Sequence, residues 1–447
     1  MRYLPHTDAD VQSMLRSIGH EALGDLVAHV PADLRRRAAI ELEAGRSEPE
    51  VLERLTALAS ENRPLEKTCF AGAGAYPHHV PAAVDTVISR SEFATAYTPY
   101  QPEVSQGTLQ AIFEFQTMVT ALFGLEVANA SMYDGASATA EAVLMARRLR
   151  PKAGRVLLAA SLPPAYRQVV RTYLEGIGDF VAEDVSFGPD GRVDSAALDR
   201  ALAGAPVAAI VVGYPSYFGV IEDLRAVGER ARGADALLVT VTPEGMALGL
   251  LREPGAVGAD IAVGEGQSFG LGLSFGGPYL GLFATRERFV RSMPGRLVSE
   301  TIDDRGRRGF VLTLATREQH IRRERATSNI CTNQGLCALA ATVYLALAGR
   351  TGLRALADRN ARRARHALRR LCDGAGAQPV FAAPFFNEFA IRLPAARRRW
   401  ERALAVDVIA GVPLGDAYPE LEDALLLCVT EVHALSDIER LVEALRP

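Results

Sequence analysis

The sequence predicts an α/β protein with a mostly parallel central sheet, and three observations lead to this fold class. From about residue 127, short apolar runs alternate with helical patterns. Strands that alternate with helices of about 10–15 residues form βαβ units, which build a parallel sheet covered on both faces. With 447 residues, 49% of them hydrophobic, the chain can bury a sizeable core. A second, shorter set of strand and helix patterns follows Gly349. We therefore expect one large and one smaller α/β domain.

The first 66 residues are predicted to form an N-terminal helical extension. Thr7-Asp-Ala-Asp10 is a helix start with acids in its first turn, and helical patterns continue to about Asn62. The pattern then breaks into glycine, proline and tyrosine between Cys69 and Gln110, in CFAGAGAYPHHVPAAV and FATAYTPYQPEVSQG. A long stretch without periodicity inside a globular chain is more often functional than a plain connector.

The large domain is predicted to span residues 67–350. A helix is expected at 107–123, and strands alternate with helices after it. The expected strands are 127–132, 155–161, 179–187, 207–214, 236–242, 259–264 and 278–284, and the helices between them are 137–149, 163–176, 194–203 and 221–233. The apolar run Leu336–Ala348 is shorter than the roughly 20 residues of a membrane-spanning helix. It predicts a buried Ala-rich helix.

The small C-terminal α/β domain is predicted to span residues 351–447. The expected elements are a basic helix at 354–372, strands near 385–393, 406–412 and 424–432, and a helix at 436–445. Arginine clusters at 359–370 and 396–402 suit a solvated helix face better than a site for a polyanion.

The composition of the chain argues against several classes of function. The formal net charge is −4, which gives no overall attraction to nucleic acid or anionic membrane. The five cysteines are scattered and never paired as C-x-x-C, so neither a disulfide framework nor a zinc site is indicated. The N-terminus lacks the apolar stretch of a secretory signal, and we expect a cytoplasmic protein. Only Lys67 and Lys152 are lysines, so any chemistry that needs a side-chain amine is restricted to these two positions.

A glycine-rich loop, GEGQSFGLGLSFGGP at residues 264–278, follows the sixth expected strand. Its spacing, G-x-G-x-x-x-G, is one residue longer than the dinucleotide fingerprint, which belongs after the first strand. A dinucleotide site is therefore disfavoured. A mostly parallel sheet followed by a small C-terminal domain is also the layout of aminotransferase-like enzymes that use pyridoxal phosphate.

A pyridoxal phosphate site needs a helix N-terminus for the phosphate, a carboxylate at the pyridine nitrogen and a lysine that forms an imine. The stretch MYDGASATAEAV places Gly135, Ser137 and Thr139 where a strand turns into a helix, so backbone N–H groups could face an anion. The alternative is that Ser137 is only a helix N-cap. The phosphate part of the site is thus plausible from the sequence.

The other two parts are missing. On the strand that should carry the carboxylate, the sequence offers Thr240 and Thr242, and Glu244 falls beyond Pro243. After strand 259–264, where the lysine should follow, stand the residues Glu265, Gln267 and Ser268. None of these side chains can form an imine. For Lys67 and Lys152 we expect solvated positions.

Several blocks of the chain resemble a known family. They are FATAYTPYQPEVSQGTLQAIFEFQT, ANASMYDGASATAEA, GEGQSFGLGLSFGGPYLGLFATRE and RRGFVLTLATREQHIRRERATSNICTNQGLCALAATVYLALAG. The chain is similar over nearly its whole length to glycine dehydrogenase (decarboxylating) subunit 1, the α subunit of the two-subunit P-protein of the glycine cleavage system. The resemblance implies a type I aminotransferase-like fold and an α2β2 assembly with subunit 2. It also implies that pyridoxal phosphate is bound by subunit 2 and not by this chain.

The implied reaction is the decarboxylation of glycine, with transfer of the aminomethyl group to the oxidised lipoyl arm of H-protein and release of CO2. In this interpretation the chain completes the active site of its partner. The alternative is a scaffold or ligand-binding protein with a degenerate aminotransferase-like pocket.

Two groups of residues are candidates for completing that site. The first is the tyrosine-rich loop, Tyr97, Thr98, Tyr100 and Gln101, with Glu103. Tyrosines on a proline-stiffened loop present rigid hydroxyls suited to a substrate carboxylate or a proton in transit. Ordinary interface packing is the alternative for Tyr97 and Tyr100.

The second group precedes the Ala-rich helix in HIRRERATSNICT, where a channel for the lipoyl arm could be lined by Arg322, Arg323, Thr327, Ser328 and Asn329. These polar side chains could equally bond only to one another. For His78 and His79, packing or an interface is favoured over catalysis.

Overall fold

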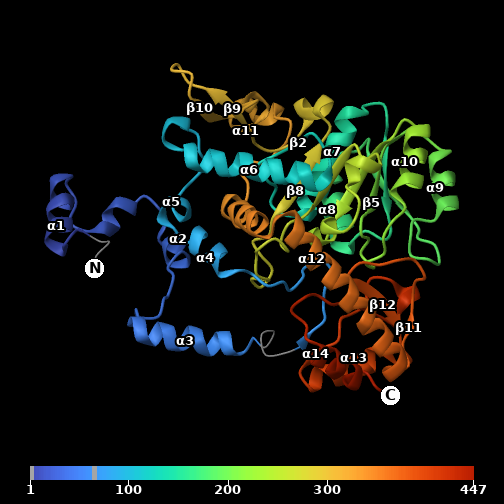
Figure 1. Cartoon of the computed structure of the whole chain (residues 1–447). Coiled ribbons are helices and arrows are strands. Elements are labelled where there is room, and N and C mark those ends of the chain that lie inside the picture. The colour runs from blue at the N-terminus through green and yellow to red at the C-terminus, as the bar shows by residue number, and fades with distance from the viewer. Residues whose placement is uncertain (1–4, 63–67) are drawn as a thin grey trace. The chain divides into compact units, whose positions relative to one another are not determined.

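The computed structural model describes residues 5–62 and 68–447 (Figure 1). The chain divides into two compact units, Met1–Arg63 and Pro64–Pro447. The further boundary predicted at residue 350, between a large and a small domain, stays a prediction.

The N-terminal unit is helical. Its elements are α1 (Asp8–Ser17), the 3-10 helix η1 (Leu23–Val27), α2 (Ala32–Arg37) and α3 (Glu48–Ser60). The predicted start at Thr7 is confirmed, because the Thr7 side chain accepts from the Asp10 N–H while the Asp10 carboxylate accepts from the Thr7 N–H. This reciprocal pair satisfies two backbone donors that a helix N-terminus otherwise leaves free.

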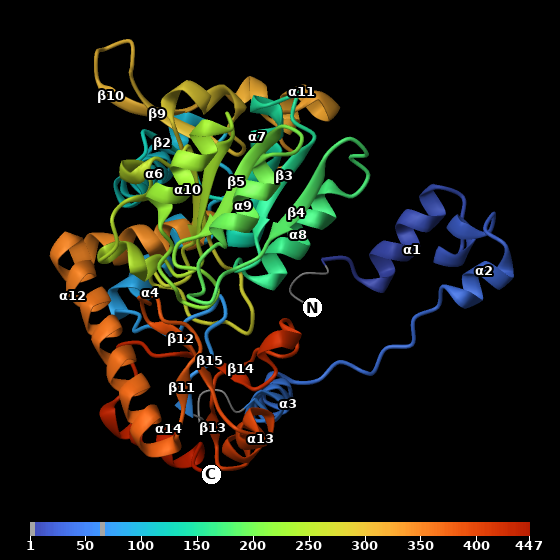
Figure 2. The same cartoon turned by 90° about the vertical axis from the view of Figure 1, so that its right-hand side faces the viewer.

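The second unit is built on a seven-stranded sheet in the order β2-β8-β7-β6-β5-β3-β4 (Figures 1 and 2). Strand β8 is antiparallel to both of its neighbours, β2 and β7. The other adjacent strands, β7-β6, β6-β5, β5-β3 and β3-β4, pair in parallel. The strands are β2 (Val127–Ala128), β3 (Arg155–Ala159), β4 (Val181–Val185), β5 (Val207–Gly213), β6 (Leu237–Thr242), β7 (Ile261–Glu265) and β8 (Gly281–Thr285). The predicted α/β fold with a mostly parallel sheet is confirmed.

Helices cover both faces of the sheet. On β7, Ile261 and Val263 pack in the cluster that contains α7 (Gly135–Leu149). Ala262 points the other way, into the cluster formed by α6 (Gln106–Phe123) and the first half of α12. This alternation follows from the two-residue period of a strand. The remaining helices of the unit's N-terminal and central parts are α4 (Ala82–Ile88), α5 (Ser91–Ala94), α8 (Pro164–Leu174), α9 (Ser195–Leu202), α10 (Leu224–Gly233) and α11 (Gln319–Arg322).

The long helix α12 (Gly335–Ala375) is broken at Gly349, which has a φ of 57° and a ψ of 179°. The positive φ at this break suits glycine, the residue that adopts such a backbone most readily. The segment before it is the predicted Ala-rich helix, and it is only half-buried: Ala340 is buried, whereas Leu347 is 55% exposed. By length and composition α12 could cross a membrane, as core helices of soluble proteins also can.

The C-terminal part contains an antiparallel sheet in the order β11-β12-β15-β14. The elements are β11 (Gln378–Pro379), β12 (Glu388–Arg392), α13 (Ala396–Ala405), β13 (Val408–Ile409), β14 (Val412–Pro413), β15 (Ala424–Cys428) and α14 (Leu435–Ala444). The short strand β1 (Thr68–Cys69) pairs in parallel with β13. The segment after β1 thus starts beside the C-terminal strands and runs from them toward the ends of the central sheet.

Candidate functional site

The carboxyl group of Glu265 occupies the N-terminus of helix α7. Glu265 is the last residue of β7 and is buried. Its Oε2 accepts the Gly135 N–H at 2.9 Å, and its Oε1 accepts the N–H groups of Gln267 at 3.0 Å and Leu280 at 2.9 Å. Free N–H groups and the helix dipole make such a helix end attractive to an anion. In this chain the anion-binding groups are satisfied by a side chain of the same chain.

The first turn of α7 is also capped from within. Asp134 is the N-cap, and its carboxylate accepts the Ser137 N–H at 2.7 Å. Ser137 is therefore the third helical residue rather than the N-cap that the sequence suggested as an alternative. The Thr139 hydroxyl donates to the Gly135 carbonyl at 2.7 Å. A Cβ at Gly135 would collide with the Tyr166 hydroxyl, so only glycine fits there.

The site is strongly desolvated. Burial raises the pKa of Glu265 to about 8, against the three backbone N–H donors, which lower it. The neighbouring carboxylate of Asp134 adds to the rise. A phosphate group would have to displace Glu265 from its three donors and would bring further negative charge beside Asp134.

The threonines that replace the ring-nitrogen carboxylate are buried in β6. Within residues 5–62 and 68–447, neither the Thr240 hydroxyl nor the Thr242 hydroxyl has a hydrogen-bond partner. Glu244, just beyond them, accepts the Met246 N–H at 2.8 Å and starts the 3-10 helix η3 (Gly245–Gly249). The other oxygen of Glu244 pairs with a protein cation.

That cation is His78. Its Nε2 lies 3.2 Å from Glu244 Oε2, and its Nδ1 lies 2.9 Å from Glu431 Oε2. Burial lowers the pKa of His78, but the two carboxylates outweigh this effect and raise it to about 10. Burial likewise raises the pKa of Glu431, but hydrogen bonding and attraction to His78 outweigh it and bring the pKa to about 2. His78 is thus a packed imidazolium between two carboxylates, whereas the neighbouring His79 is exposed.

The positions after β7 are used for internal hydrogen bonds. Gln267 binds the backbone of Tyr76 at both ends: its Oε1 accepts the N–H at 2.9 Å, and its Nε2 donates to the carbonyl at 3.0 Å. The Tyr76 hydroxyl donates to Glu388 Oε2 at 3.0 Å, and Ser268 is buried. The segment around Tyr76 therefore closes over the positions where a lysine would be needed.

Glu388 is expected to make the stability of the folded chain depend on pH. Burial raises its pKa to about 8, so between about pH 4.5 and 8 the folded chain keeps a proton that the unfolded chain releases. The free energy of unfolding should then fall by up to about 1.4 kcal/mol per pH unit across this window. We expect Glu388→Gln to remove this part of the slope, measured by chemical denaturation at pH 5, 6.5 and 8. An unchanged slope would show that Glu388 is ionised at neutral pH.

Lys152, the lysine that the structure describes, lies away from this cluster. Lys152 is exposed in the turn before β3, at the amino edge of the parallel strands, whereas Glu265 stands at their carboxyl edge. Lys67 lies outside the described residues. The residues that are described do not fit pyridoxal phosphate: the helix N-terminus is filled, the ring-nitrogen carboxylate is replaced by threonine, and no amine faces the site.

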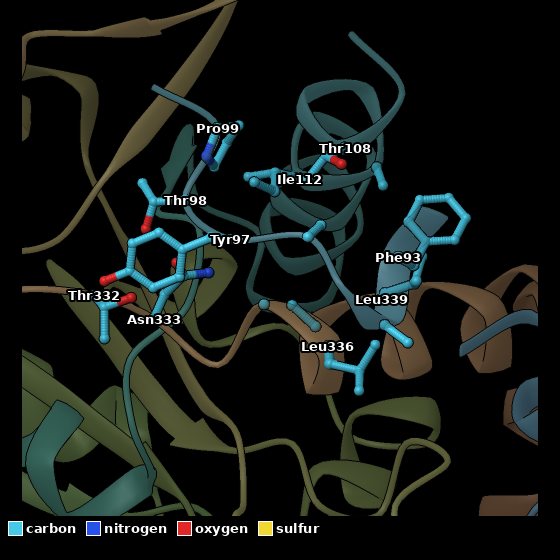
Figure 3. Close-up of a pocket in the computed structure, with 15 residues that line it drawn as sticks. Phe93, Tyr97, Thr98, Pro99, Thr108, Ile112, Thr332, Asn333, Leu336 and Leu339 are labelled. Atoms are coloured by element: carbon cyan, nitrogen blue, oxygen red, sulfur yellow. The ribbon is translucent and has the colours of Figure 1, made fainter. Parts of the chain in front are cut away.

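The tyrosine-rich loop lines a cavity of about 220 Å³ (Figure 3). The polar residues that line it are Tyr97, Thr98, Thr108, Thr332 and Asn333. Helices α5, α6 and α12 contribute the apolar wall with Phe93, Ile112, Leu336 and Leu339. Tyr97 is 82% exposed and Tyr100 47% exposed, and Gln101 and Glu103 are exposed as well.

Arg296 connects the tyrosine-rich loop to Cys331 and Thr332, just before helix α12, and the sequence analysis missed it. It lies just before strand β9 (Leu297–Ile302), which forms a hairpin with β10 (Arg308–Thr313). Its guanidinium contacts Thr98 and Tyr100 of the loop and also Cys331 and Thr332. As one of 47 arginines with no motif around it, Arg296 carried no local signal.

The structure brings together only part of the second candidate group, the residues predicted to line a channel for the lipoyl arm. Thr327 and Ser328 are half-buried beside the turn at Met293–Gly295, and the Thr327 N–H donates to the Arg317 carbonyl at 3.0 Å. Arg322, Arg323 and Asn329 are exposed and are not among the residues that lie beside this turn. Their predicted part in a lipoyl channel stays a prediction.

Comparison with known proteins gives a consistent result over the whole chain. The family model described as "Glycine cleavage system P-protein" matches residues 1–445. Two relatives named "Probable glycine dehydrogenase (decarboxylating) subunit 1" cover 100% of this chain. The relative from Desulfotalea psychrophila is 49% identical, with 98% of its own length covered. The relative from Anaeromyxobacter dehalogenans is 50% identical, with 100% covered.

Solved structures agree. A crystal structure of glycine decarboxylase (P-protein) of the glycine cleavage system superposes with a TM-score of 0.89 at 44% identity, covering 100% of this chain and 99% of that one. An alanine–glyoxylate aminotransferase from Nostoc sp. superposes with a TM-score of 0.59 at 15% identity, covering 92% of this chain and 97% of that one, which shows the shared fold alone. The chain belongs to the glycine cleavage system P-protein family, within its glycine dehydrogenase (decarboxylating) subunit 1 group.

Proposed function

We propose that this chain is the α subunit that does not hold pyridoxal phosphate and that it completes the active site of a pyridoxal phosphate-bearing subunit 2. A subunit 1 implies a subunit 2, and the aminotransferase-like P-protein fold implies pyridoxal phosphate in the system. The observation that supports the proposal is Glu265, whose carboxyl group accepts the Gly135 N–H at the helix N-terminus that a cofactor phosphate would need. When bound in the complex, the cofactor supplies the electron sink for loss of CO2 from glycine.

In this proposal the two subunits form an α2β2 assembly in the cytoplasm. The complex decarboxylates glycine and transfers the aminomethyl group to the oxidised lipoyl arm of H-protein. Tyr97, Thr98, Tyr100, Gln101 and Glu103 extend toward the partner's site. Thr98 is half-buried, and the exposure of the other four leaves them available for that site. Arg322, Arg323, Thr327, Ser328 and Asn329 line the approach of the lipoyl arm.

The double variant Lys67→Arg and Lys152→Arg tests whether this chain holds the cofactor. Co-expressed with subunit 2, it should keep the pyridoxal phosphate content and the glycine decarboxylation rate of the wild-type complex, because arginine keeps the charge and cannot form the imine. Cofactor absorbance and release of CO2 from labelled glycine are the measurements. Loss of the cofactor from a folded double variant would contradict the proposal.

The same material separates this function from the alternative of a scaffold or ligand-binding protein. Each subunit purified alone should lack activity, and the mixture should regain it. A chain that forms no complex with subunit 2, and adds nothing to its activity, would favour the alternative.

A further inference from the structure

Arg296 is a buried guanidinium that reaches two hydroxyls of the exposed tyrosine-rich loop. It is 4% exposed. Its Nη1 donates to Thr98 Oγ1 at 3.1 Å and its Nη2 donates to Tyr100 Oη at 3.0 Å. The guanidinium carbon also lies 5.3 Å from the centre of the Tyr100 ring. An arginine presents several donors in a fixed plane, so one side chain can hold both hydroxyls in a defined geometry.

The other contacts of Arg296 anchor it to distant parts of the chain. Nη2 donates to the Cys331 carbonyl at 2.7 Å, Nη1 contacts Thr332 Oγ1 at 3.4 Å, and Nε lies 3.3 Å from Glu318 Oε2. Glu318 is buried and supplies the negative charge that a buried guanidinium needs. Segments far apart in the sequence therefore meet at one charge-balanced group.

The direction of these hydrogen bonds decides what the loop can do. An arginine is only a donor, so the Tyr100 and Thr98 oxygens act as acceptors toward it. Within residues 5–62 and 68–447, neither hydroxyl donates to a protein acceptor. Each hydroxyl therefore keeps its own proton for an acceptor other than the described residues of this chain; Tyr100 is 47% exposed and Thr98 is half-buried.

We propose that Arg296 is a positioning residue that fixes Tyr100 and Thr98 as outward hydrogen-bond donors to the carboxylate of the amino-acid substrate in the shared active site. This inference rests on the proposed function, in which the loop reaches the partner's site. The carboxylate loses its negative charge as CO2 forms. Hydrogen bonds to it therefore stabilise bound glycine at least as much as the transition state, and their loss should appear in KM rather than in kcat.

The test is a double-mutant cycle in the co-expressed complex. We expect Tyr100→Phe and Arg296→Met each to raise KM for glycine by about tenfold, with kcat within about twofold of the wild type. The double variant should be no worse than Arg296→Met, because the tyrosine hydroxyl acts only when Arg296 holds it. An unchanged KM in both single variants, or independent effects that multiply in the double variant, would overturn the proposal.

A matched control is Arg308→Met. Arg308 also lies over an aromatic ring, at 5.1 Å from the centre of Phe310, and pairs with a carboxylate, Glu300, at 2.7 Å, but this pair is exposed. The KM of the Arg308→Met complex for glycine should stay unchanged. A rise in KM equal to that of Arg296→Met would assign the effect to general loss of arginine and contradict a specific role.

Hydrogen exchange gives a second readout that does not depend on turnover. In the complex, Arg296→Met should raise exchange in residues 97–101 and 331–333 and leave the central sheet unchanged. Unchanged exchange in both segments would contradict the positioning role. If Arg296→Met does not assemble, Arg296→Lys keeps the charge but not the fork of donors, and the same rise in KM is expected; a wild-type KM would overturn the proposal. The location of pyridoxal phosphate, which tests the proposed function, is a separate measurement.

Discussion

Replacing His78 with alanine is expected to lower the free energy of unfolding by about 3–5 kcal/mol, because the change removes the cation from a buried pair of carboxylates. The His78 side chain is 1% exposed, and Glu244 and Glu431 are 1% and 5% exposed. Without the imidazolium, the two carboxylates stay buried beside each other's charge or must take up protons. Urea denaturation of the chain at pH 6 measures the effect.

The neighbouring residue provides a matched control. His79 is exposed, and only its backbone N–H contacts Glu431, so His79→Ala should change stability by less than about 0.5 kcal/mol. Raised to about 10, the pKa of His78 gives a stabilisation that is complete below about pH 6.5 and is lost as the pH rises through 10. Glu431, with a pKa near 2, contributes above about pH 4.5 and loses this contribution as the pH falls through 2. Equal effects of the two histidine variants would contradict this account.

Replacing Glu265 with alanine is expected to destabilise the chain by more than about 3 kcal/mol, since three backbone N–H groups lose their acceptor in a buried site. The affected donors are those of Gly135, Gln267 and Leu280. Acetate should partly restore the stability of this variant, because it replaces the CH2 and carboxylate that the substitution removes. The melting temperature with and without acetate is the measurement.

Glu265→Gln is the matched control, because glutamine keeps the size of the side chain and replaces the carboxyl group with an amide. One amide oxygen can keep the donors of Gln267 and Leu280, whereas the amide nitrogen cannot accept from Gly135. We expect a smaller loss of stability and no response to acetate. An alanine variant as stable as the wild type would show that the helix N-terminus does not depend on this carboxylate.

The strands and helices of the central sheet were predictable because their signal is local. The apolar run at 207–214 and the helical pattern at 137–149 each specify one element, and the structure has β5 and α7 there. The prediction that residues 336–348 form a buried helix was too general, because Leu347 is exposed whereas Ala338, Ala340 and Ala341 are buried. Local sequence patterns therefore predict that a helix or strand forms more reliably than they predict which of its residues are buried.

The site was less predictable because its contacts join residues far apart in the chain. His78 meets Glu244 across 166 positions and Glu431 across 353. The missing lysine could be read from the sequence, but the sequence did not reveal that Glu265 would fill the helix N-terminus. The glycine-rich loop at residues 264–278 indicated where the site lies in the sequence, but it did not indicate which groups the loop contacts. Arg296 was missed for the same reason, since its partners in the tyrosine-rich loop lie 196 and 198 positions away.

The central proposal is that the aminotransferase-like site of this chain holds no amine and that the chain relies on the pyridoxal phosphate of another subunit. Borohydride reduction of the co-expressed complex, followed by peptide mass spectrometry of both subunits, tests it most directly. We predict a reduced pyridoxyl group on a lysine of subunit 2 and none on this chain. A pyridoxyl group on Lys67 or Lys152 would contradict the account.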